Sequence, residues 1–435
     1  MTRRTVSALV AMGFWLAVGA VASPGAELPQ EEDKPADPRR ELFDKVSEHI
    51  LIRISNTLEK NENLRDATYP YWYDTMGRKL TDALKAYTCS GDETYLKQFV
   101  RLMQHVLSKR YIHPQLPELW RGWWDITRRE PVNFLERMFN PPNYSVSHAA
   151  EVYYVPALMF VETVRADPKL KAEYGPLAEE WLKDIDELDM PSWDKQGRWK
   201  DLDERGGVYN TGMAYPDPRT HEIVGKLDDE HSTLTYRSLA PVVNALARLH
   251  RLTQKPIYRQ KLTRLATWFR SNWMVEGKYV SWYARNHAGP WDFVSGEFGK
   301  GEPKNKLRFA PEGPQNLPCV EFAVTCYNAG AVFTREDIEK LLWTNLRFMW
   351  MGDRKKPRFR MLTGEFLSRQ FAFDKPWMPN WGEGNLWWPL AQYNEDVREL
   401  WLALTGNYRL RSTYALNYLL ITRRPVSWEP RPAMW

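Results

Sequence analysis

The chain has 435 residues, of which 43% are hydrophobic and 26% are charged, and its formal net charge is +5. This composition is typical of a globular protein, and it excludes a disordered tail protein and a collagen-like fibre. The small positive charge excludes the dense basic surface of a nucleic-acid binder, and the three cysteines form neither a disulfide framework nor a metal-binding spacing.

The N-terminal segment has the three parts of an export signal. Arg3 and Arg4 are followed by an apolar stretch, and the sequence Ala-Val-Ala ends at Ala22. We therefore expect a signal peptide at 1–22, with cleavage after Ala22, and a secreted or periplasmic protein; an uncleaved membrane anchor is the alternative. The polar, proline-containing segment 23–40 predicts a disordered linker.

Helical periodicity dominates the rest of the chain, and predicts an all-α protein. Apolar residues recur at three- and four-residue spacing in many segments. These segments are 41–60, 73–88, 93–108, 148–165, 173–187, 233–252, 257–272, 318–331, 335–350, 386–404 and 408–420. We expect one domain over 41–425, followed by a C-terminal tail at 426–435.

The connections between the predicted helices alternate between short and long. Short turns such as 90–92 and 253–256 contain Gly, Asp or Pro, as helix ends require. Long connections, such as 188–230 and 273–315, are rich in Trp, Tyr, Gly and Pro. Because the two kinds alternate, all long connections should emerge at one end of the helix pairs, where binding and catalysis concentrate.

The helices that follow long connections are the more apolar ones, so they should form an inner ring within an outer ring. About six such hairpins resemble the α/α-toroid, or six-hairpin, scaffold of many carbohydrate-active enzymes. The resemblance covers roughly residues 38–425, and it implies an (α/α) toroid with long loops at one end. A helical solenoid that does not close is the competing architecture.

Two histidines are expected to open inner helices. His148 and His231 each precede an apolar helix, where the helix N-terminus favours an anionic ligand. Glu230 beside His231 could orient or charge that histidine. A capping or packing role is the alternative for both histidines.

The densest polar cluster is the loop from Trp282 to His287. In an extended segment, Tyr283, Arg285 and His287 share one side. A tyrosine that transfers protons beside an arginine that neutralises a carboxylate is what β-elimination of a uronic acid requires. A surface hairpin without a catalytic role is the alternative.

This inventory resembles that of toroidal polysaccharide lyases of the alginate and glucuronan lyase type, which act without a metal. The resemblance implies a lyase with Tyr283 as base or acid, His231 or His148 as the second proton-transfer group, and Asn210 with Arg285 as carboxylate neutralisers. Tyr209 would add a second tyrosine. No cofactor or metal is implied. The chain departs from the alginate-lyase pattern, because Asn286-His287 is followed by Ala-Gly-Pro and not by a helix.

A glycoside hydrolase is the competing enzyme, and it needs two carboxyl groups across the scissile bond. Glu230 or Asp229 could act with Glu383 or Glu321, although acidic residues before helices are also ordinary N-caps. A C5-epimerase would use the lyase chemistry without bond cleavage. A glycan-binding periplasmic protein without catalysis is the third hypothesis.

The chain contains 21 Trp and 21 Tyr, and those in the long loops are expected to stack on sugar rings. The expected substrate-binding residues are Trp72, Trp124, Tyr209, Trp282, His287, Trp381 and Glu383. Arg121 and Arg285 lie beside loop tryptophans, which favours an anionic polysaccharide as the partner. The oligomeric state is left open.

Overall fold

A computed structural model gives the structure of the chain. It describes residues 38–63, 72–123, 145–212, 215–216, 220–224, 230–283, 286–303, 316–355, 357–359, 386–407 and 412–431. Helices dominate the described part, as the periodicity predicted. None of the described helices combines the length and the apolar character that crossing a membrane requires.

The described helices pair as inner and outer elements. The inner elements are α2 (Trp72–Ser90), α6 (Val155–Ala166), α9 (Tyr236–Thr253), α11 (Asn316–Asn328), the 3₁₀ helix η7 (Trp388–Gln392) and α15 (Ser412–Thr422). The outer elements are α1 (Pro38–Asn63), α3 (Glu93–Ser108), α7 (Pro168–Lys183), α10 (Pro256–Ser271), α12 (Arg335–Trp343) and α14 (Glu395–Asn407).

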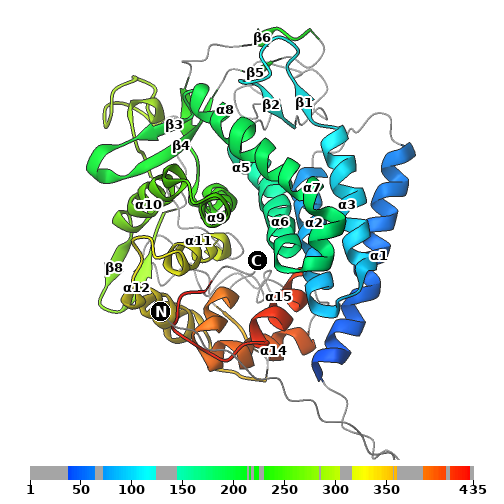
Figure 1. The fold of residues 1–435 in the computed structure, drawn as a ribbon. Helices are drawn as coiled ribbons and strands as arrows, with labels where there is room; N and C mark the ends of the chain where they lie inside the picture. Colours follow the sequence, from blue (N-terminus) through cyan, green and yellow to red (C-terminus); the bar gives the residue numbers. More distant parts are fainter. Residues whose placement is uncertain are drawn as a thin grey trace, which may run out of the picture.

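The inner elements form a closed ring. Going round it, α2 contacts α6, α6 contacts α9, α9 contacts α11, α11 contacts η7, η7 contacts α15, and α15 contacts α2. The last contact joins the two ends of the chain, and Thr413 Oγ1 donates a hydrogen bond of 2.9 Å to Asp82 Oδ2 there. Figure 1 shows the same path, from blue α1 through green α9 and yellow α11 to red α15 beside α2. The fold is therefore an (α/α) toroid, and the open solenoid is excluded.

Short turns join inner helices to outer ones where the sequence predicted them. Asp92 caps α3 by accepting a hydrogen bond of 2.8 Å from the Thr94 amide, and Gly91 before it has φ +74°. Asp167 caps α7 in the same way, through the Lys169 amide at 2.8 Å. Gln254 ends α9 in the left-handed conformation, with φ +57°. These residues start or end the helices, because their side chains or backbone conformations satisfy the unpaired amide and carbonyl groups at the helix ends.

Several predicted helices are interrupted. The segment 146–166 consists of α5 (Val146–Ala149), the π-helical turn η1 (Ala150–Tyr154) and α6. Further π-helical turns are η2 (Asp184–Asp189), which continues into α8 (Met190–Lys195), and η6 (Thr344–Met349), which follows α12. The predicted helix 386–404 divides into η7 and α14, and the Asn394 side chain accepts a hydrogen bond from the Val397 amide at the start of α14.

Short antiparallel strands lie within the long connections. β3 (Trp199–Asp201), β4 (Gly207–Gly212) and β7 (Glu230–Thr233) form a three-stranded sheet, with Asn210 opposite Thr233. The two-stranded pairs are β1 (Tyr111–Ile112) with β2 (Arg121–Gly122), β5 (Tyr215–Pro216) with β6 (Ile223–Val224), and β8 (Met274–Glu276) with β9 (Tyr279–Ser281). Figure 1 shows β1, β2, β5 and β6 together at one edge of the ring.

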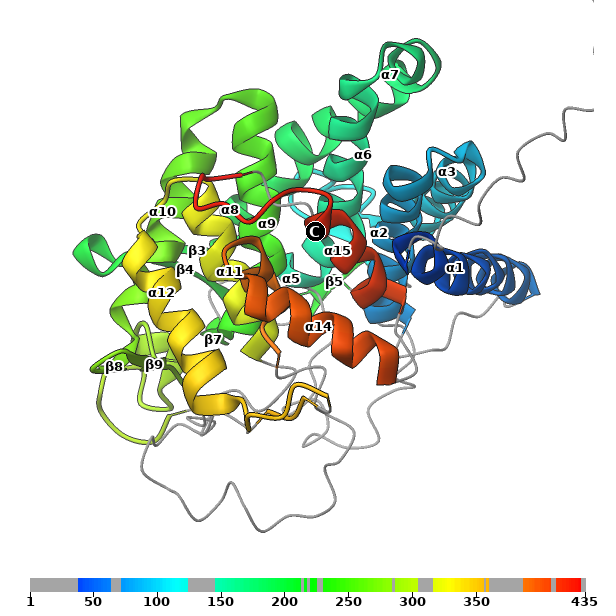
Figure 2. The same cartoon turned by 90° about the horizontal axis from the view of Figure 1, so that it is seen from below.

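The C-terminal segment after α15 returns to the ring. Trp428 stacks on Tyr393 with ring centroids 5.2 Å apart, and its carbonyl accepts a hydrogen bond of 2.8 Å from the Tyr327 hydroxyl. Figure 2, seen from below, shows this red segment passing in front of the yellow α11.

Candidate active site

The ring encloses a cavity of about 530 Å³, a volume that suits a ligand of sugar size. Its walls are formed by the inner elements α2, α5–η1, α6, α9, α11 and α15, together with η7. The charged, histidine, asparagine and aromatic side chains that line it are Arg78, Lys85, His148, Glu151, Arg237, Asn244, Glu321, Trp388, Tyr414 and Asn417. We call this the central cavity.

Glu321 is a carboxyl group of the central cavity whose surroundings perturb its pKa. It lies in the second turn of α11, among buried apolar residues such as Val320 and Phe322. Burial raises its pKa to about 7, although Lys85 and Arg78 oppose the shift. A carboxylic acid that holds its proton near neutral pH can act as a general acid.

Glu151 is the second carboxyl group of the central cavity, and its charge also raises the pKa of Glu321. It belongs to the π-helical turn η1, a type of element that is frequent at functional sites. Gly77 of α2 packs directly on this turn: a Cβ atom at Gly77 would lie 2.3 Å from the Glu151 carbonyl oxygen. Only glycine allows the close approach of α2 that fixes Glu151 in the wall.

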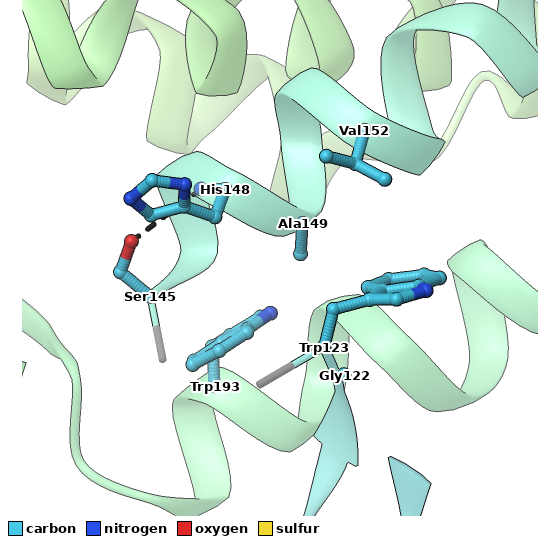
Figure 3. A pocket seen from close by; sticks show the side chains of 7 residues that line it. All are labelled: Gly122, Trp123, Ser145, His148, Ala149, Val152 and Trp193. Atoms are coloured by element: carbon cyan, nitrogen blue, oxygen red, sulfur yellow. Dashed lines mark hydrogen bonds between the residues drawn. The ribbon is translucent and has the colours of Figure 1, made fainter. Parts of the chain in front are cut away.

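His148 lies between the central cavity and a small crevice of about 10 Å³. Ser145 caps α5 by accepting a hydrogen bond of 3.4 Å from the His148 amide, and Figure 3 shows Trp123 and Trp193 on the other side of the crevice. The crevice has room for about one water molecule, so the central cavity is the part of this region that can hold a ligand.

Asn244 is held by charged groups behind the cavity wall. Its Oδ1 accepts a hydrogen bond of 2.7 Å from Arg248 Nε, and Arg248 forms an ion pair with Glu162. The amide of Asn244 is therefore fixed with its oxygen toward Arg248.

Among the residues assigned to β-elimination, Asn210, Tyr209 and Tyr283 lie away from the described lining of this cavity. Asn210 and Tyr209 are buried in β4, and the Tyr209 hydroxyl lies 3.3 Å from Lys261 of the outer helix α10. Tyr283 is half-buried and is not among the cavity-lining residues described. Of the six predicted catalytic residues, His148 is the one that lines the described cavity wall.

Two of the predicted catalytic residues lie on a strand. Glu230 and His231 begin β7, whereas α9 begins at Tyr236, after the N-cap Thr235. The expectation that His231 opens the helix is therefore wrong. Pairing of 230–233 with β4 takes these residues into the sheet, and the structure describes their backbone only.

Several predicted substrate-binding residues are packed inside the protein. Trp282 is fully buried and stacks on Trp273 at 6.0 Å, so it is unavailable to a sugar. His287 is half-buried and packs against Phe293 at 4.9 Å. The side chain of Trp72 lies outside the described atoms, and Trp124, Arg285, Trp381, Glu383 and Asp229 lie outside the described residues.

The loop tryptophans mainly anchor the loops. Trp120, Trp123 and Trp193 are buried. Arg121, expected to recognise a carboxylate on a glycan, instead binds Asp184 at 2.7 Å and Asp189 at 2.8 Å. These side chains form a buried ionic cluster with Arg110, and we refer to Arg110, Arg121, Asp184 and Asp189 as the ionic cluster.

Four charged residues of the cavity wall were not predicted from the sequence: Glu151, Lys85, Arg78 and Arg237. A signal for two of them was present. Glu151 follows His148 by three residues, on the same helical face, and precedes a long apolar stretch. Lys85 lies within the buried run from Ala83 to Ala86. A charged residue between apolar neighbours that are buried faces a partner or a cavity.

No family model matches the chain, and no curated protein matches it. Among solved structures, it is similar to the GH76A α-1,6-mannanase from Salegentibacter sp. HEL1_6, with a TM-score of 0.40 and 11% identity over 82% of this chain and 90% of that one. An inactive variant of that protein in complex with α-1,6-mannotriose gives a TM-score of 0.41 at 11% identity, over 81% and 88% of the two chains.

The polysaccharide-lyase interpretation is wrong. Asn210, Tyr209 and Tyr283 do not line the central cavity, which instead presents the carboxyl groups of Glu151 and Glu321.

Proposed function

We propose that the protein is a glycoside hydrolase whose active site is the central cavity. The observation that carries this proposal is the pair Glu321 and Glu151, which line one cavity of about 530 Å³ from different elements. Burial raises the pKa of Glu321 to about 7. Glycoside hydrolysis uses two carboxyl groups, one of which holds a proton near neutral pH.

In the proposed reaction, protonated Glu321 donates its proton to the leaving glycosidic oxygen as the C–O bond breaks. Glu151 accepts a proton from a water molecule, whose oxygen bonds to the anomeric carbon. The element η1 and the helix α11 are separated in the ring by α9, so the two carboxyl groups approach the substrate from different walls.

The other lining residues suit substrate binding. Trp388 and Tyr414 bring aromatic rings to the wall, and Ser238, Asn244 and Thr325 bring hydrogen-bonding groups. Sugars present apolar C–H faces and many hydroxyl groups, and this mixture of side chains matches both.

We also propose that the enzyme acts outside the cytoplasm on a polysaccharide or an oligosaccharide. The supporting observation is the N-terminal sequence, with Arg3 and Arg4 before an apolar stretch that ends in Ala-Val-Ala at Ala22. N-terminal sequencing of the exported protein tests this: a mature chain that begins at Ser23 supports export, and an intact Met1 in the cytoplasm contradicts it.

Incubation with a panel of glycans tests the activity. The panel contains α-1,6-mannan, other neutral glycans, and acidic glycans such as alginate and glucuronan. New reducing ends without the ultraviolet absorbance of unsaturated sugars support the hydrolase, and proton NMR of the first product gives the anomeric configuration. Binding without any product would replace the hydrolase with a glycan-binding protein.

A further inference from the structure

Lys85 is a buried basic side chain that faces the central cavity. It lies in the fourth turn of α2, its side chain lines the cavity, and the residue is 4% exposed. It forms no hydrogen bond or ion pair with any of the residues that the structure describes. An ammonium group that is removed from water without a partner destabilises the fold, so buried lysines are normally paired.

Lys261 shows how the same chain treats a buried lysine elsewhere. It is also 4% exposed, but it forms an ion pair with Asp194 and lies 5.3 Å from the centre of the Trp199 ring. The difference is one of surroundings: Lys261 is enclosed by protein partners, whereas Lys85 opens to a cavity that can hold a ligand.

Two further cations face the central cavity. Arg78 lies two turns before Lys85 on the same face of α2, and Arg237 lies in the first turn of α9. Both are exposed, and neither forms an ion pair within the described part of the chain. The cations therefore occupy two walls, and all three can reach a ligand in the cavity.

The carboxyl groups in the same cavity do not balance these cations near neutral pH. Glu321 is largely protonated below pH 7, because burial raises its pKa to about 7. The charged and titratable groups that surround it are Lys85 and Arg78 on α2, His148 on α5, Glu151 on η1 and Arg237 on α9. Glu151 in the wall and the buried Asp82, whose charge acts on Lys85, then oppose three cations, so an excess of positive charge remains and the cavity attracts negative charge.

We propose that the central cavity contains an anion-binding subsite in which Lys85, with Arg78 and Arg237, holds an acidic substituent of the glycan. The substituent is a carboxylate, sulfate or phosphate group, since each accepts charge-assisted hydrogen bonds from ammonium and guanidinium groups. This inference rests on the proposed function for the identity of the ligand as a glycan, and it names the class of glycan.

Anion binding is coupled to the protonation of Glu321. A negative group beside Lys85 and Arg78 disfavours an ionised carboxylate nearby, so the protonated form of Glu321 binds the anion more tightly. Affinity for the acidic sugar should therefore fall as the pH rises through about 7. In the Glu321→Gln variant, this fall should be absent.

Binding of four small probes tests the subsite: D-glucose, D-glucuronate, glucose 6-sulfate and glucose 6-phosphate, each titrated into the full-length protein at pH 6. The wild type should bind at least one acidic probe roughly 10-fold more tightly than glucose, the range expected of one or two charged hydrogen bonds. The preferred probe identifies the acidic group. Lys85→Met keeps the aliphatic stem and should abolish the preference.

Lys97→Met is the matched control, because Lys97 is an exposed lysine on the outer helix α3. The proposal is overturned if the wild type binds glucose and all three acids equally, or if Lys85→Met changes the preference no more than Lys97→Met does. Should Lys85→Met fail to fold, Arg78→Gln at an exposed position gives the same comparison. Because binding is measured without turnover, loss of the subsite and loss of the hydrolase are separate outcomes.

Discussion

The central cavity and the ionic cluster are two groups of charged side chains in the same fold, and they differ in how their charges are paired. In the ionic cluster, Arg110 and Arg121 each bind both Asp184 and Asp189, and Tyr153 donates a hydrogen bond of 2.9 Å to Asp184. In the central cavity, Lys85 has no ion pair among the described residues, and Glu321 is held in an environment that favours its protonated form.

This difference in charge pairing distinguishes a cluster that stabilises the fold from a site that can bind a ligand. In the ionic cluster each charged side chain is already paired within the protein, so none is left to bind a ligand. The cluster instead joins the connection 109–123 to the turn η2. A charged side chain that faces a cavity without an ion-pair partner can still bind a ligand. Titratable groups with perturbed pKa values in cavities are typical of active sites. The arginine that looked functional in the sequence, Arg121, belongs to the first kind, and Lys85 belongs to the second.

Removing the proposed base should have the largest effect. Glu151→Ala should lower the rate of glycan hydrolysis by about 10²- to 10⁴-fold, the usual contribution of general acid–base catalysis. Sodium azide should restore part of the rate and give a glycosyl azide, because a small anion can occupy the place of the missing carboxylate. Mass spectrometry detects that product. A rate within threefold of the wild type would remove Glu151 from the mechanism.

Breaking the ionic cluster should affect stability instead of chemistry. Asp189→Asn leaves two buried guanidinium groups short of one carboxylate, and should lower the free energy of unfolding by about 3 to 5 kcal/mol. The folded fraction should keep a specific activity close to that of the wild type. Urea unfolding and activity assays at matched folded concentration measure the two effects, and an unchanged stability would contradict a structural role for the cluster.

The raised pKa of Glu321 predicts a pH-dependent stability. The ordinary pKa of glutamate is 4.5, and in the folded protein it is about 7. The folded state therefore binds a proton more tightly than the unfolded state, and stability falls as the pH rises from about 4.5 to about 7. The fall should be at most about 3 kcal/mol, and smaller because water enters the cavity.

The Glu321→Gln variant isolates that contribution. Urea unfolding of the wild type and of the variant between pH 4.5 and 8 should show a difference that grows up to about pH 7 and then stays constant. A difference that is independent of pH would mean that Glu321 titrates normally in the folded protein.

Crowding the π-helical turn should have the smallest effect. Gly77→Ala would place a Cβ atom 2.3 Å from the Glu151 carbonyl oxygen, so α2 or η1 must shift, at about 1 to 3 kcal/mol. Because η1 carries Glu151, activity should also decrease. Gly175→Ala on α7 is the control, since its Cβ would meet only Lys171 Cγ at 3.7 Å. Equal effects of the two substitutions would contradict the packing argument.

The sequence predicted the fold better than the site. The alternation of short and long connections and the apolar inner helices predicted the toroid, because helical periodicity and capping are local signals. The π-helical turn η1 and the division of 386–404 into η7 and α14 were not predicted, since the same apolar spacing fits a continuous helix. Of the groups that line the cavity, His148 and Glu321 were named in advance because they lie near the starts of inner helices.

The other residues that line the central cavity could not be predicted, because their position depends on contacts between elements that are distant in the sequence. Lys85 and Glu151 lie in different helical elements, and only closure of the ring brings α2, η1 and α11 around one cavity. Trp282 and Asn210 were misassigned because a loop position in the sequence does not reveal that the loop folds back and buries them.

The Glu321→Gln variant tests the central claim most directly. Its hydrolysis of the glycan that the wild type cleaves should be compared at pH 6 with that of Glu339→Gln, a substitution on the exposed side of α12. The hydrolase proposal predicts a rate at least about 100-fold lower for Glu321→Gln, with unchanged folding, and a wild-type rate for Glu339→Gln. Hydrolysis by Glu321→Gln within threefold of the wild type would contradict the claim that the central cavity is the active site.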